Sequence, residues 1–238
     1  MSDSKAFPGR LALVTGASRG IGAATAEALA AAGAHVILVA RTAAALEEVE
    51  DRIHVAGGTA TIAPLDLTDG ESIGKLAGAV AERWQRLDIL VMNAAMLGSL
   101  TPVQDIDPKE YSRLLSLNLL ANQALIAAFD PLLRKADHAD VFALTSSVGG
   151  TPRAFWGAYG SSKAALESLL GAYADETEHT RRITVHIVDP GATRTRMRAL
   201  AFPGEEPESV KPPEVVARSI VERLAANAPS GEKIRIEA

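Results

Sequence analysis

Two side chains, Tyr159 and Lys163, have the types and the spacing that acid/base chemistry requires. On a helix, residues four apart lie on one face, so the phenol and the ammonium group would be neighbours. A nearby positive charge lowers the pKa of a phenol, which would make Tyr159 an acid/base near neutral pH. A packed ring beside a solvated amine has the same spacing. The elements around the pair must therefore decide between the two interpretations.

A glycine-rich turn lies near the start of the chain, between an apolar run and an alanine-rich segment. Residues 11–14 are typical of a strand buried on both faces, and residues 23–32 favour a helix that ends before Gly33. Glycine tolerates positive φ and lets backbone N–H groups approach a pyrophosphate at a helix N-terminus. The spacing differs from the usual Gly-x-Gly-x-x-Gly, and a glycine-rich surface turn is the alternative. The turn residues expected to contact a dinucleotide are Gly16, Ser18, Arg19, Gly20, Ile21 and Gly22.

Two arginines indicate which dinucleotide this is. Arg41 follows the second apolar run, residues 35–40, at the place where NAD-binding units carry an acid for the ribose 2′-hydroxyl. Arg19 is a second cation in the turn. Guanidinium groups match phosphate geometry, so the pair predicts NADP(H) rather than NAD, with merely solvated arginines as the alternative.

Apolar runs and helix-forming segments alternate along the rest of the chain. Further strands are expected at residues 59–65, 88–92, 141–145, 183–189 and 233–236. Helices are expected at residues 43–56, 70–85, 107–135, 156–178 and 213–227. This alternation predicts an α/β fold, a doubly wound Rossmann-type sheet of about seven mostly parallel strands with helices on both faces. We expect residues 1–238 to form one domain, with its ligand crevice at the carboxyl ends of the strands.

Small or polar residues follow two of these strands. Asp66, beside Leu67, is expected to accept a hydrogen bond from the exocyclic amine of adenine, while Asp69 is better placed to cap the next helix. Asn93 and Ala94 follow the fourth strand and would let a ribose or ring pack against the backbone. All but Asp69 are candidate cofactor contacts.

Asn118 and Ser146 are further candidates for the site. Asn118 lies in an apolar stretch of the 107–135 helix, where an interior Asn suggests either a polar partner or a local distortion. Ser146 and Ser147 follow the fifth strand and precede residues 148–150 (Val-Gly-Gly), which are expected to be flexible. Catalytic groups of parallel sheets gather at this edge.

Composition excludes several classes of function. A net charge of −5 argues against a nucleic-acid backbone or an anionic membrane surface as the main partner. The absence of cysteine excludes disulfides and thiolate catalysis, and five scattered histidines predict no histidine-based metal site. The start of the chain has no apolar signal region and no stretch is long enough to span a bilayer, so a cytoplasmic location is expected.

Taken together, these residues resemble the short-chain dehydrogenase/reductase family over essentially the whole chain. The matching positions, in the order and spacing of the family, are Thr15, Gly16, Gly20, Gly22, Asp66, Asn93, Ala94, Asn118, Ser146, Tyr159, Lys163, Pro190 and Gly191. The resemblance implies that Tyr159 donates or accepts the proton and that Ser146 orients the substrate, with Ser147 as a substitute. It also implies that Lys163 binds the nicotinamide ribose and lowers the pKa of the tyrosine. Asn118 would distort its helix so that a water and a proton relay reach the lysine.

The chain departs from the family pattern at two places. The usual Asn-Asn-Ala-Gly reads Met-Asn-Ala-Ala, with Ala95 in the place of the glycine, so the backbone beside the nicotinamide ribose is expected to be shifted or less adaptable. After Pro190 and Gly191, the family's branched apolar residue is also replaced. There we expect Thr193 to contact the nicotinamide carboxamide through its backbone and Thr195 to lie near the pyrophosphate.

The segment that follows, residues 192–212, has little periodicity and is expected to be a lid over the substrate. Its arginines at 194, 196 and 198 suggest an anionic substrate. Solvated arginines, or ion pairs with Glu205 and Glu206, are equally good explanations. We expect the substrate pocket to be lined by residues 97–103, 148–156 and 192–212, in which no motif identifies the substrate.

The sequence therefore predicts an NADP(H)-dependent oxidoreductase that interconverts a carbonyl and an alcohol in a small molecule. A 3-oxoacyl-thioester reductase is the alternative within the enzyme class, and a non-catalytic NADP-binding sensor or interaction module is the alternative outside it. The resemblance further implies a homotetramer or homodimer formed through the helices at 107–135 and 156–178.

Overall fold

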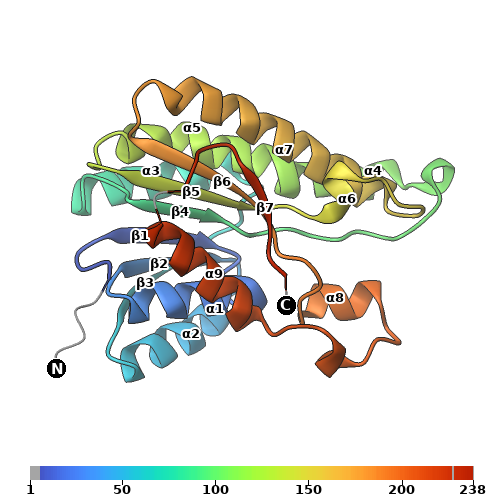
Figure 1. The fold of residues 1–238 in the computed structure, drawn as a ribbon, viewed down its shortest axis with the longest axis horizontal. Coiled ribbons are helices and arrows are strands. Elements are labelled where there is room, and N and C mark those ends of the chain that lie inside the picture. The colour runs from blue at the N-terminus through green and yellow to red at the C-terminus, as the bar shows by residue number, and fades with distance from the viewer. Residues whose placement is uncertain (1–5, 227, 238) are drawn as a thin grey trace.

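The computed structural model describes residues 6–226 and 228–237, and one seven-stranded sheet organises them (Figure 1). All strands are parallel and follow the order β3-β2-β1-β4-β5-β6-β7. The strands are β1 (Leu11–Thr15), β2 (His35–Ala40), β3 (Thr59–Pro64), β4 (Ile89–Met92), β5 (Ala139–Leu144), β6 (Ile183–Asp189) and β7 (Lys233–Arg235). The predicted doubly wound sheet is confirmed.

The central strands are apolar without interruption because both of their faces are covered. Leu11 and Leu13 of β1 point into one core, while Ala12 and Val14 point into the other. All four side chains are buried. A strand covered on only one side would alternate apolar and polar residues, so the continuous run at 11–14 reflects the two helical layers.

Three helices cover each face of the sheet. Helices α1, α2 and α9 supply one core, and α3, α5 and α7 supply the other, as the two layers in Figure 1 show. These helices are α1 (Gly20–Ala31), α2 (Ala43–Val55), α3 (Gly70–Arg83), α5 (Ala121–Leu133), α7 (Gly157–Glu178) and α9 (Pro213–Ala225). Asp69 caps α3 as predicted, because its side chain accepts a hydrogen bond from the N–H of Glu71. Helix α9 was expected to reach Asn227, which lies outside the described residues.

The helix predicted at 107–135 is interrupted. It begins as α4 (Pro108–Leu115), where Asp107 accepts hydrogen bonds from the N–H groups of Lys109 and Glu110. A π-helical segment, η2 (Ser116–Leu120), then separates α4 from α5. Asn118 lies in the middle of η2, so the local distortion predicted from this interior Asn is present.

Two segments expected to be irregular contain short helices. Residues 148–150 were predicted to be flexible, but they belong to α6 (Ser147–Gly150), which packs on α7. The close approach depends on Gly160, since a Cβ there would lie 3.0 Å from the carbonyl oxygen of Val148. The 192–212 segment contains α8 (Arg196–Ala201) and the 3-10 turn η3 (Pro207–Ser209), while η1 (Val103–Asp105) precedes α4.

The end of the sheet where β1 and β4 begin carries a buried polar network. The Asp140 carboxylate accepts a hydrogen bond from Arg10 at 2.7 Å and lies 3.0 Å from Nε2 of His186. Arg10 also donates to the carbonyl of Asp88 at 3.0 Å. Burial, the largest effect, raises the pKa of Asp140, but His138, His186 and Arg10 together hold it well below its usual range. The sequence prediction began β5 at Val141 and missed this network, because a charged residue inside a strand is unexpected.

Candidate active site

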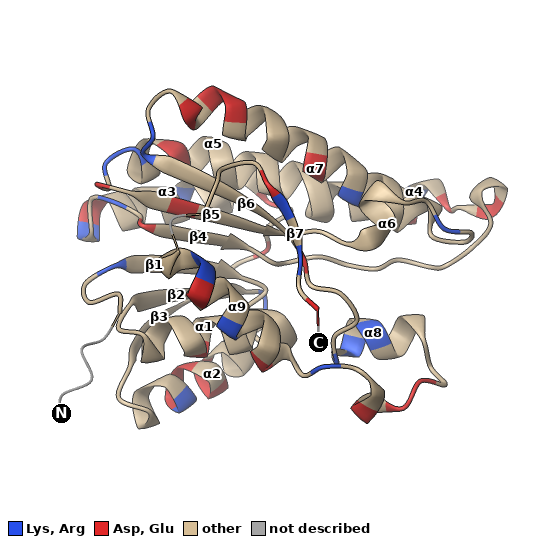
Figure 2. Cartoon of the chain, viewed as in Figure 1, with Lys and Arg blue, Asp and Glu red and all other residues tan. Residues whose placement is uncertain are grey.

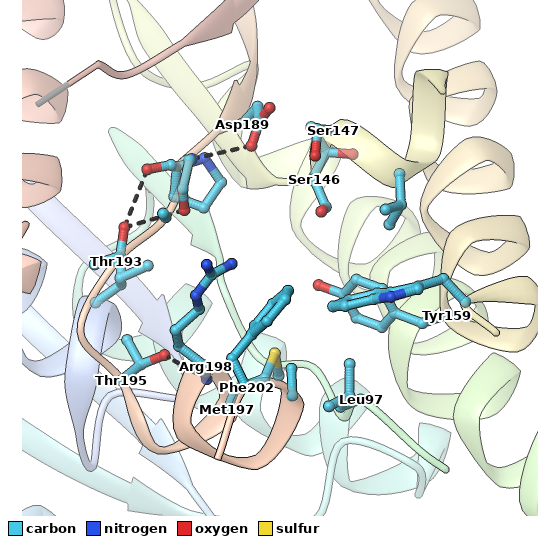
Figure 3. A pocket seen from close by; sticks show the side chains of 18 of the residues that line it. Leu97, Ser146, Ser147, Tyr159, Asp189, Thr193, Thr195, Met197, Arg198 and Phe202 are labelled. Atoms are coloured by element: carbon cyan, nitrogen blue, oxygen red, sulfur yellow. Dashed lines mark hydrogen bonds between the residues drawn. The ribbon is translucent and has the colours of Figure 1, made fainter. Parts of the chain in front are cut away.

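The order of the strands reverses between β1 and β4, so a crevice is expected at the carboxyl ends of the strands there. A cavity of about 330 Å³ lies at this edge of the sheet (Figure 3). Its lining comes from the end of β5, from α6 and α7, from the segment after β6 and from α8. Tyr159, Ser146, Pro190, Gly191, Thr193 and Thr195 all line it, as the sequence predicts.

Tyr159 and Lys163 lie on one face of α7, and both are buried. Tyr159 is 7% exposed and Lys163 is 2% exposed, so the alternative of a solvated amine is wrong. Lys163 donates a hydrogen bond from Nζ to the carbonyl of Leu144 at 2.8 Å, and Nζ lies 5.7 Å from the centre of the Tyr159 ring. The strand end of β5 therefore holds the ammonium group near the phenol.

Burial dominates the protonation of this pair. It raises the pKa of Tyr159, and the charge of Asp189 acts in the same direction. Burial lowers the pKa of Lys163 to about 8, while Glu167 acts to raise it. The lysine was expected to lower the pKa of the tyrosine, but in this structure both effects on that pKa, burial and the charge of Asp189, raise it. The phenol of Tyr159 is therefore protonated at neutral pH.

The hydroxyl groups of Ser146, Ser147 and Tyr159 line the cavity without hydrogen-bond partners among the described residues. Among the described residues, neither the Ser146 hydroxyl nor the Tyr159 hydroxyl makes a hydrogen bond. Both side chains point into the cavity in Figure 3. Ser147 lines the same cavity from the start of α6, so it stays the alternative to Ser146. A ligand oxygen placed between Ser146 and Tyr159 would satisfy both hydroxyls.

Asn118 supports this part of the site from η2 and is fully buried. Its side-chain amide donates to the carbonyl of Met96 at 2.9 Å and to the hydroxyl of Ser162 at 3.1 Å, and its side-chain oxygen accepts from the N–H of Met96 at 2.9 Å. Its backbone carbonyl accepts from the side chain of Asn122 at 2.8 Å. Asn118 thus has the predicted polar partners and ties the segment after β4 to α7.

The glycine turn is tightly packed, which argues against an ordinary surface turn. Gly16 and Gly20 have φ of +65° and +55°, values that favour glycine. Gly22 packs so closely on the carbonyl of Gly16 that there is no space for a Cβ, and the site of that Cβ also lies 2.5 Å from Nδ2 of Asn93. Asn93 in turn donates to the carbonyl of Thr15 at 2.9 Å.

The neighbours of the turn include Ala94 and Thr195. The N–H of Ala94 donates to the hydroxyl of Thr15 at 3.1 Å, which fixes the strand end of β4 against β1. Thr195 caps α8, and its methyl carbon lies 3.4 Å from the position that a Cβ of Gly20 would take. Thr195 therefore lies next to the turn, where a pyrophosphate is expected.

The residues predicted to bind the adenosine end lie in the glycine turn and after β2 and β3. Arg19 and Arg41 are both exposed, directly before α1 and directly after β2. Asp66 accepts hydrogen bonds from the N–H and the hydroxyl of Thr68 at 2.9 and 2.8 Å, and these bonds lower the pKa of its carboxyl. Leu67 is buried in the core, whereas Ser18 and Ile21 are half-buried and Ile21 reaches the cavity.

The segment after β6 bends sharply around the cavity. Gly191 has φ of +63°, and its N–H donates to the carboxylate of Asp189 at 3.0 Å. Thr193 is buried and its hydroxyl donates to the carbonyl of Pro190 at 3.0 Å. The hydroxyl of Thr193 is thus used within the turn, and the predicted contact of its backbone with the carboxamide stays a prediction.

The wall opposite the serines is apolar and aromatic, and sequence patterns did not single out its residues. The side chains of Leu97, Trp156, Met197 and Phe202 form it, together with Arg153. They come from the three loops that were expected to line the substrate pocket. Within those loops no periodicity or spacing marks a pocket residue, so only the folded structure identifies them.

Two of the three arginines of the 192–212 segment lie near acids. Arg198 forms a two-pronged ion pair with Glu205, with Nε 2.6 Å from a carboxylate oxygen. Arg194 lies 3.8 Å from Glu208. Of the two explanations left open for these arginines, ion pairing holds for Arg198 with Glu205. Figure 2 shows the basic residues of α8 near the acidic residues that follow this helix in the chain.

Comparison with known proteins places this arrangement in a family. A family model described as short chain dehydrogenase matches residues 10–206. The chain belongs to the short-chain dehydrogenase family. YciK, an uncharacterized oxidoreductase of Escherichia coli (strain K12), is 39% identical over 207 residues, which are 86% of this chain and 81% of YciK.

Solved structures of the family superpose closely on this chain. A short chain dehydrogenase from Salmonella enterica serovar Typhi has a TM-score of 0.94 at 34% identity, with 100% of both chains covered. A short chain dehydrogenase from Shigella flexneri complexed with NADP also has a TM-score of 0.94 at 34% identity, with 99% of this chain and 100% of that chain covered. Among the described residues, no helix is long and apolar enough to cross a membrane.

Proposed function

We propose that this short-chain dehydrogenase interconverts a carbonyl and an alcohol in a small molecule and uses NADP(H). The observation that carries the proposal is the pair of unpartnered hydroxyls, Ser146 and Tyr159, facing one cavity beside the buried Lys163. A carbonyl oxygen is an acceptor that both hydroxyls can hold. Retention of a complete proton-transfer set also argues against a module that only binds the cofactor.

The residues of the glycine turn fit the proposed cofactor. The lack of space at Gly22 and the positive φ of Gly16 and Gly20 keep the backbone of the turn exposed at the N-terminus of α1. Arg19 and Arg41 would receive a 2′-phosphate, and no acid stands after β2 to prefer a hydroxyl. The NADP complex of the Shigella flexneri relative supports the same choice.

Each polar residue of the site has a role in this proposal. When bound, NADPH would supply a hydride to the carbonyl carbon. Tyr159 donates its proton to the carbonyl oxygen in reduction and accepts it back in oxidation, and Ser146 orients that oxygen. Lys163 binds the nicotinamide ribose and is the nearest ammonium group that can favour the phenolate. Asn118 holds η2 in place and leads a proton relay toward the lysine.

The segment at 192–212 would act as the lid. Met197 and Phe202 of this segment form part of the apolar wall, so a substrate bound at Tyr159 would be enclosed when the segment lies over it. Exclusion of water strengthens the hydrogen bonds from Ser146 and Tyr159 to the substrate oxygen. We propose no natural substrate.

Replacement of Tyr159 by Phe tests the mechanism. The variant removes the proton donor and little volume, so we expect turnover in NADPH oxidation with a carbonyl panel to fall by roughly a thousandfold or more. The affinity for NADPH, measured by calorimetry, should stay within about threefold of the wild type.

Tyr173→Phe is the matched control. Tyr173 lies on the same helix, and its hydroxyl donates to Asp130 at 2.8 Å, away from the cavity. This variant should keep its turnover. Residual turnover of Tyr159→Phe at the level of Tyr173→Phe would refute the mechanism, and failure of the wild type to oxidise NADPH with any carbonyl would favour a binding module.

A further inference from the structure

One cation of the cavity has no anionic partner. The cavity is lined by three arginines, and two of them face acids: Arg198 pairs with Glu205, and Arg235 lies 3.6 Å from Asp189 and 3.0 Å from Glu237. Arg153, in contrast, forms no ion pair and no side-chain hydrogen bond with any described residue. Its guanidinium group therefore brings one uncompensated positive charge to the cavity wall.

Arg153 is held over the aromatic part of that wall. Its guanidinium carbon lies 5.8 Å from the centre of the Trp156 ring and 5.3 Å from the centre of the Phe202 ring. The Trp156 ring itself lies 6.0 Å from the Tyr159 ring, edge to face. Trp156 thus neighbours both the phenol and the cation, and all three line the same cavity.

The backbone that presents Arg153 and Trp156 is constrained. Phe155, which directly precedes Trp156 in the chain, has φ of +71°, a strained conformation for a bulky side chain. The carbonyl of Phe155 accepts from the N–H of Thr101 at 3.1 Å, and the N–H of Trp156 donates to the carbonyl of Arg153 at 3.1 Å. These bonds fix a tight turn, so Arg153 and Trp156 have their relative positions before a substrate arrives.

We propose that Arg153 is a specificity-determining residue that selects carbonyl substrates bearing a carboxylate beyond a short apolar segment. The inference rests on the proposed function, which places the carbonyl at Tyr159. The apolar segment would lie against Trp156, Met197 and Leu97, and the carboxylate would bind the guanidinium fork. The two ring distances given above set an upper limit on the span between the Tyr159 ring and the guanidinium group, and one benzene ring or a short alkyl chain is within that limit.

Charge and geometry favour a carboxylate over a doubly charged phosphate. The other lining arginines are engaged by Glu205, Asp189 and Glu237, so Arg153 is the one cation of the lining that is unpaired among the described residues. One negative charge neutralises it. Of the arginines at 194, 196 and 198, only Arg198 lines the cavity, and it is paired with Glu205. Arg153 lies close to Arg198, because its guanidinium carbon is 5.3 Å from the centre of the Phe202 ring over which Arg198 also lies.

Kinetics with matched substrates test the selection. The pair is 4-acetylbenzoate and methyl 4-acetylbenzoate, in which a benzene ring separates the acetyl carbonyl from a charged or a neutral group. We expect the wild type to prefer the acid in kcat/KM of NADPH oxidation, and Arg153→Gln to lose roughly five- to tenfold on the acid alone. Arg153→Lys keeps the charge without the fork and should recover part of the preference. Arg218→Gln, at an exposed position on α9, is the control with the same loss of charge and should behave like the wild type.

A binding measurement separates failure of this inference from failure of the proposed function. Calorimetry with NADPH-loaded protein compares 4-isopropylbenzoate with 4-isopropylbenzamide, neither of which has a reducible ketone. Tighter binding of the acid that is lost in Arg153→Gln supports the inference even if no ketone is turned over. The inference is overturned if the wild type does not bind the acid more tightly than the amide, or binds neither detectably. It is also overturned if Arg153→Gln keeps the preference for the acid. Reduction of methyl 4-acetylbenzoate would leave the proposed function standing in that case.

Discussion

The two ionisable groups of the candidate site have opposite shifts that arise from the same cause. Burial disfavours the charged form of each, so it raises the pKa of Tyr159 and lowers that of Lys163 to about 8. Both groups thereby become easier to keep neutral, and the proton of Lys163 becomes easier to lose near physiological pH. The spacing of the pair was visible in the sequence, but the extent of burial was not, because it depends on α6 and the 192–212 segment.

The Lys163 shift predicts a distinctive pH dependence of stability. Between pH 8 and pH 10 the folded lysine has released its proton while the unfolded lysine, with an ordinary pKa near 10.5, still holds it. The unfolded state then binds more protons, so the free energy of unfolding rises with pH in this window, by about 2 kcal/mol from this group. Lys163→Met should lack this rise.

Urea unfolding followed by tryptophan fluorescence at pH 7.5 to 10 would measure this rise in the free energy of unfolding. Lys109→Met, at an exposed position, is the control. Equal pH slopes for the wild type and Lys163→Met would contradict the assigned burial. Above pH 10 the raised pKa of Tyr159 acts in the opposite direction, because the unfolded tyrosine ionises first.

At the scale of elements, strands and long helices were predictable and short helices were not. The apolar runs at 11–14 and 35–40 located β1 and β2 closely, because a strand buried on both faces needs such runs. Helix α8, with Arg196–Ala201, is too short to produce a periodic pattern. The turn at Gly149 and Gly150 looked flexible by composition, yet packing of α6 on α7 makes it helical.

The sequence identified the glycines of the turn but only part of the reason why glycine is needed there. The spacing suggested glycines that expose backbone to a pyrophosphate, whereas the structure adds that Gly22 packs on Gly16 and Asn93. The contact joins α1 to the strand ends of β1 and β4. Glycine is thus required at position 22 by packing within the protein itself, whether or not a cofactor is bound.

Gly22→Ala tests this contact. The added methyl group must displace the carbonyl of Gly16 or the amide of Asn93, so we expect a loss of about 1–3 kcal/mol in the free energy of unfolding. The affinity for NADPH should fall by roughly tenfold or more as the turn shifts.

Gly78→Ala is the control, since Gly78 is exposed on α3 and has open space around its Cβ position. Better helix propensity should make that variant more stable by about 0.5–1 kcal/mol. If the two substitutions had the same effect, the turn would not be as tightly packed as described.

At the scale of the whole molecule, the crevice between β1 and β4 lies where the two halves of the sheet meet. One half runs from β1 to β3 and the other from β4 to β7. The predicted cofactor contacts are divided between them, with Arg41 on one side and Pro190 to Thr195 on the other. The predicted dimer or tetramer stays a prediction.

A ligand that binds both halves should stabilise the folded state in proportion to its affinity. We therefore expect NADPH to raise Tm more than NADH does at equal concentration. In Arg41→Gln the advantage of NADPH should shrink, because one of the two cations for the 2′-phosphate is lost. Thermal scans with Arg218→Gln as the control would check this expectation. An equal shift by both nucleotides in the wild type would argue against NADP(H) as the preferred cofactor.

The Asp140 network lies at the end of the sheet away from the crevice, and its partners belong to different strand regions. Asp140 is in β5, His186 is in β6, and Arg10 immediately precedes β1. Side chains alternate faces along a strand, so a slip of β5 by one residue would turn the carboxylate to the opposite layer and away from both partners. A buried, ionised and unpaired group costs several kcal/mol. The network therefore discriminates against misaligned strand pairings during folding, which uniform apolar runs such as those of β1 and β4 cannot do.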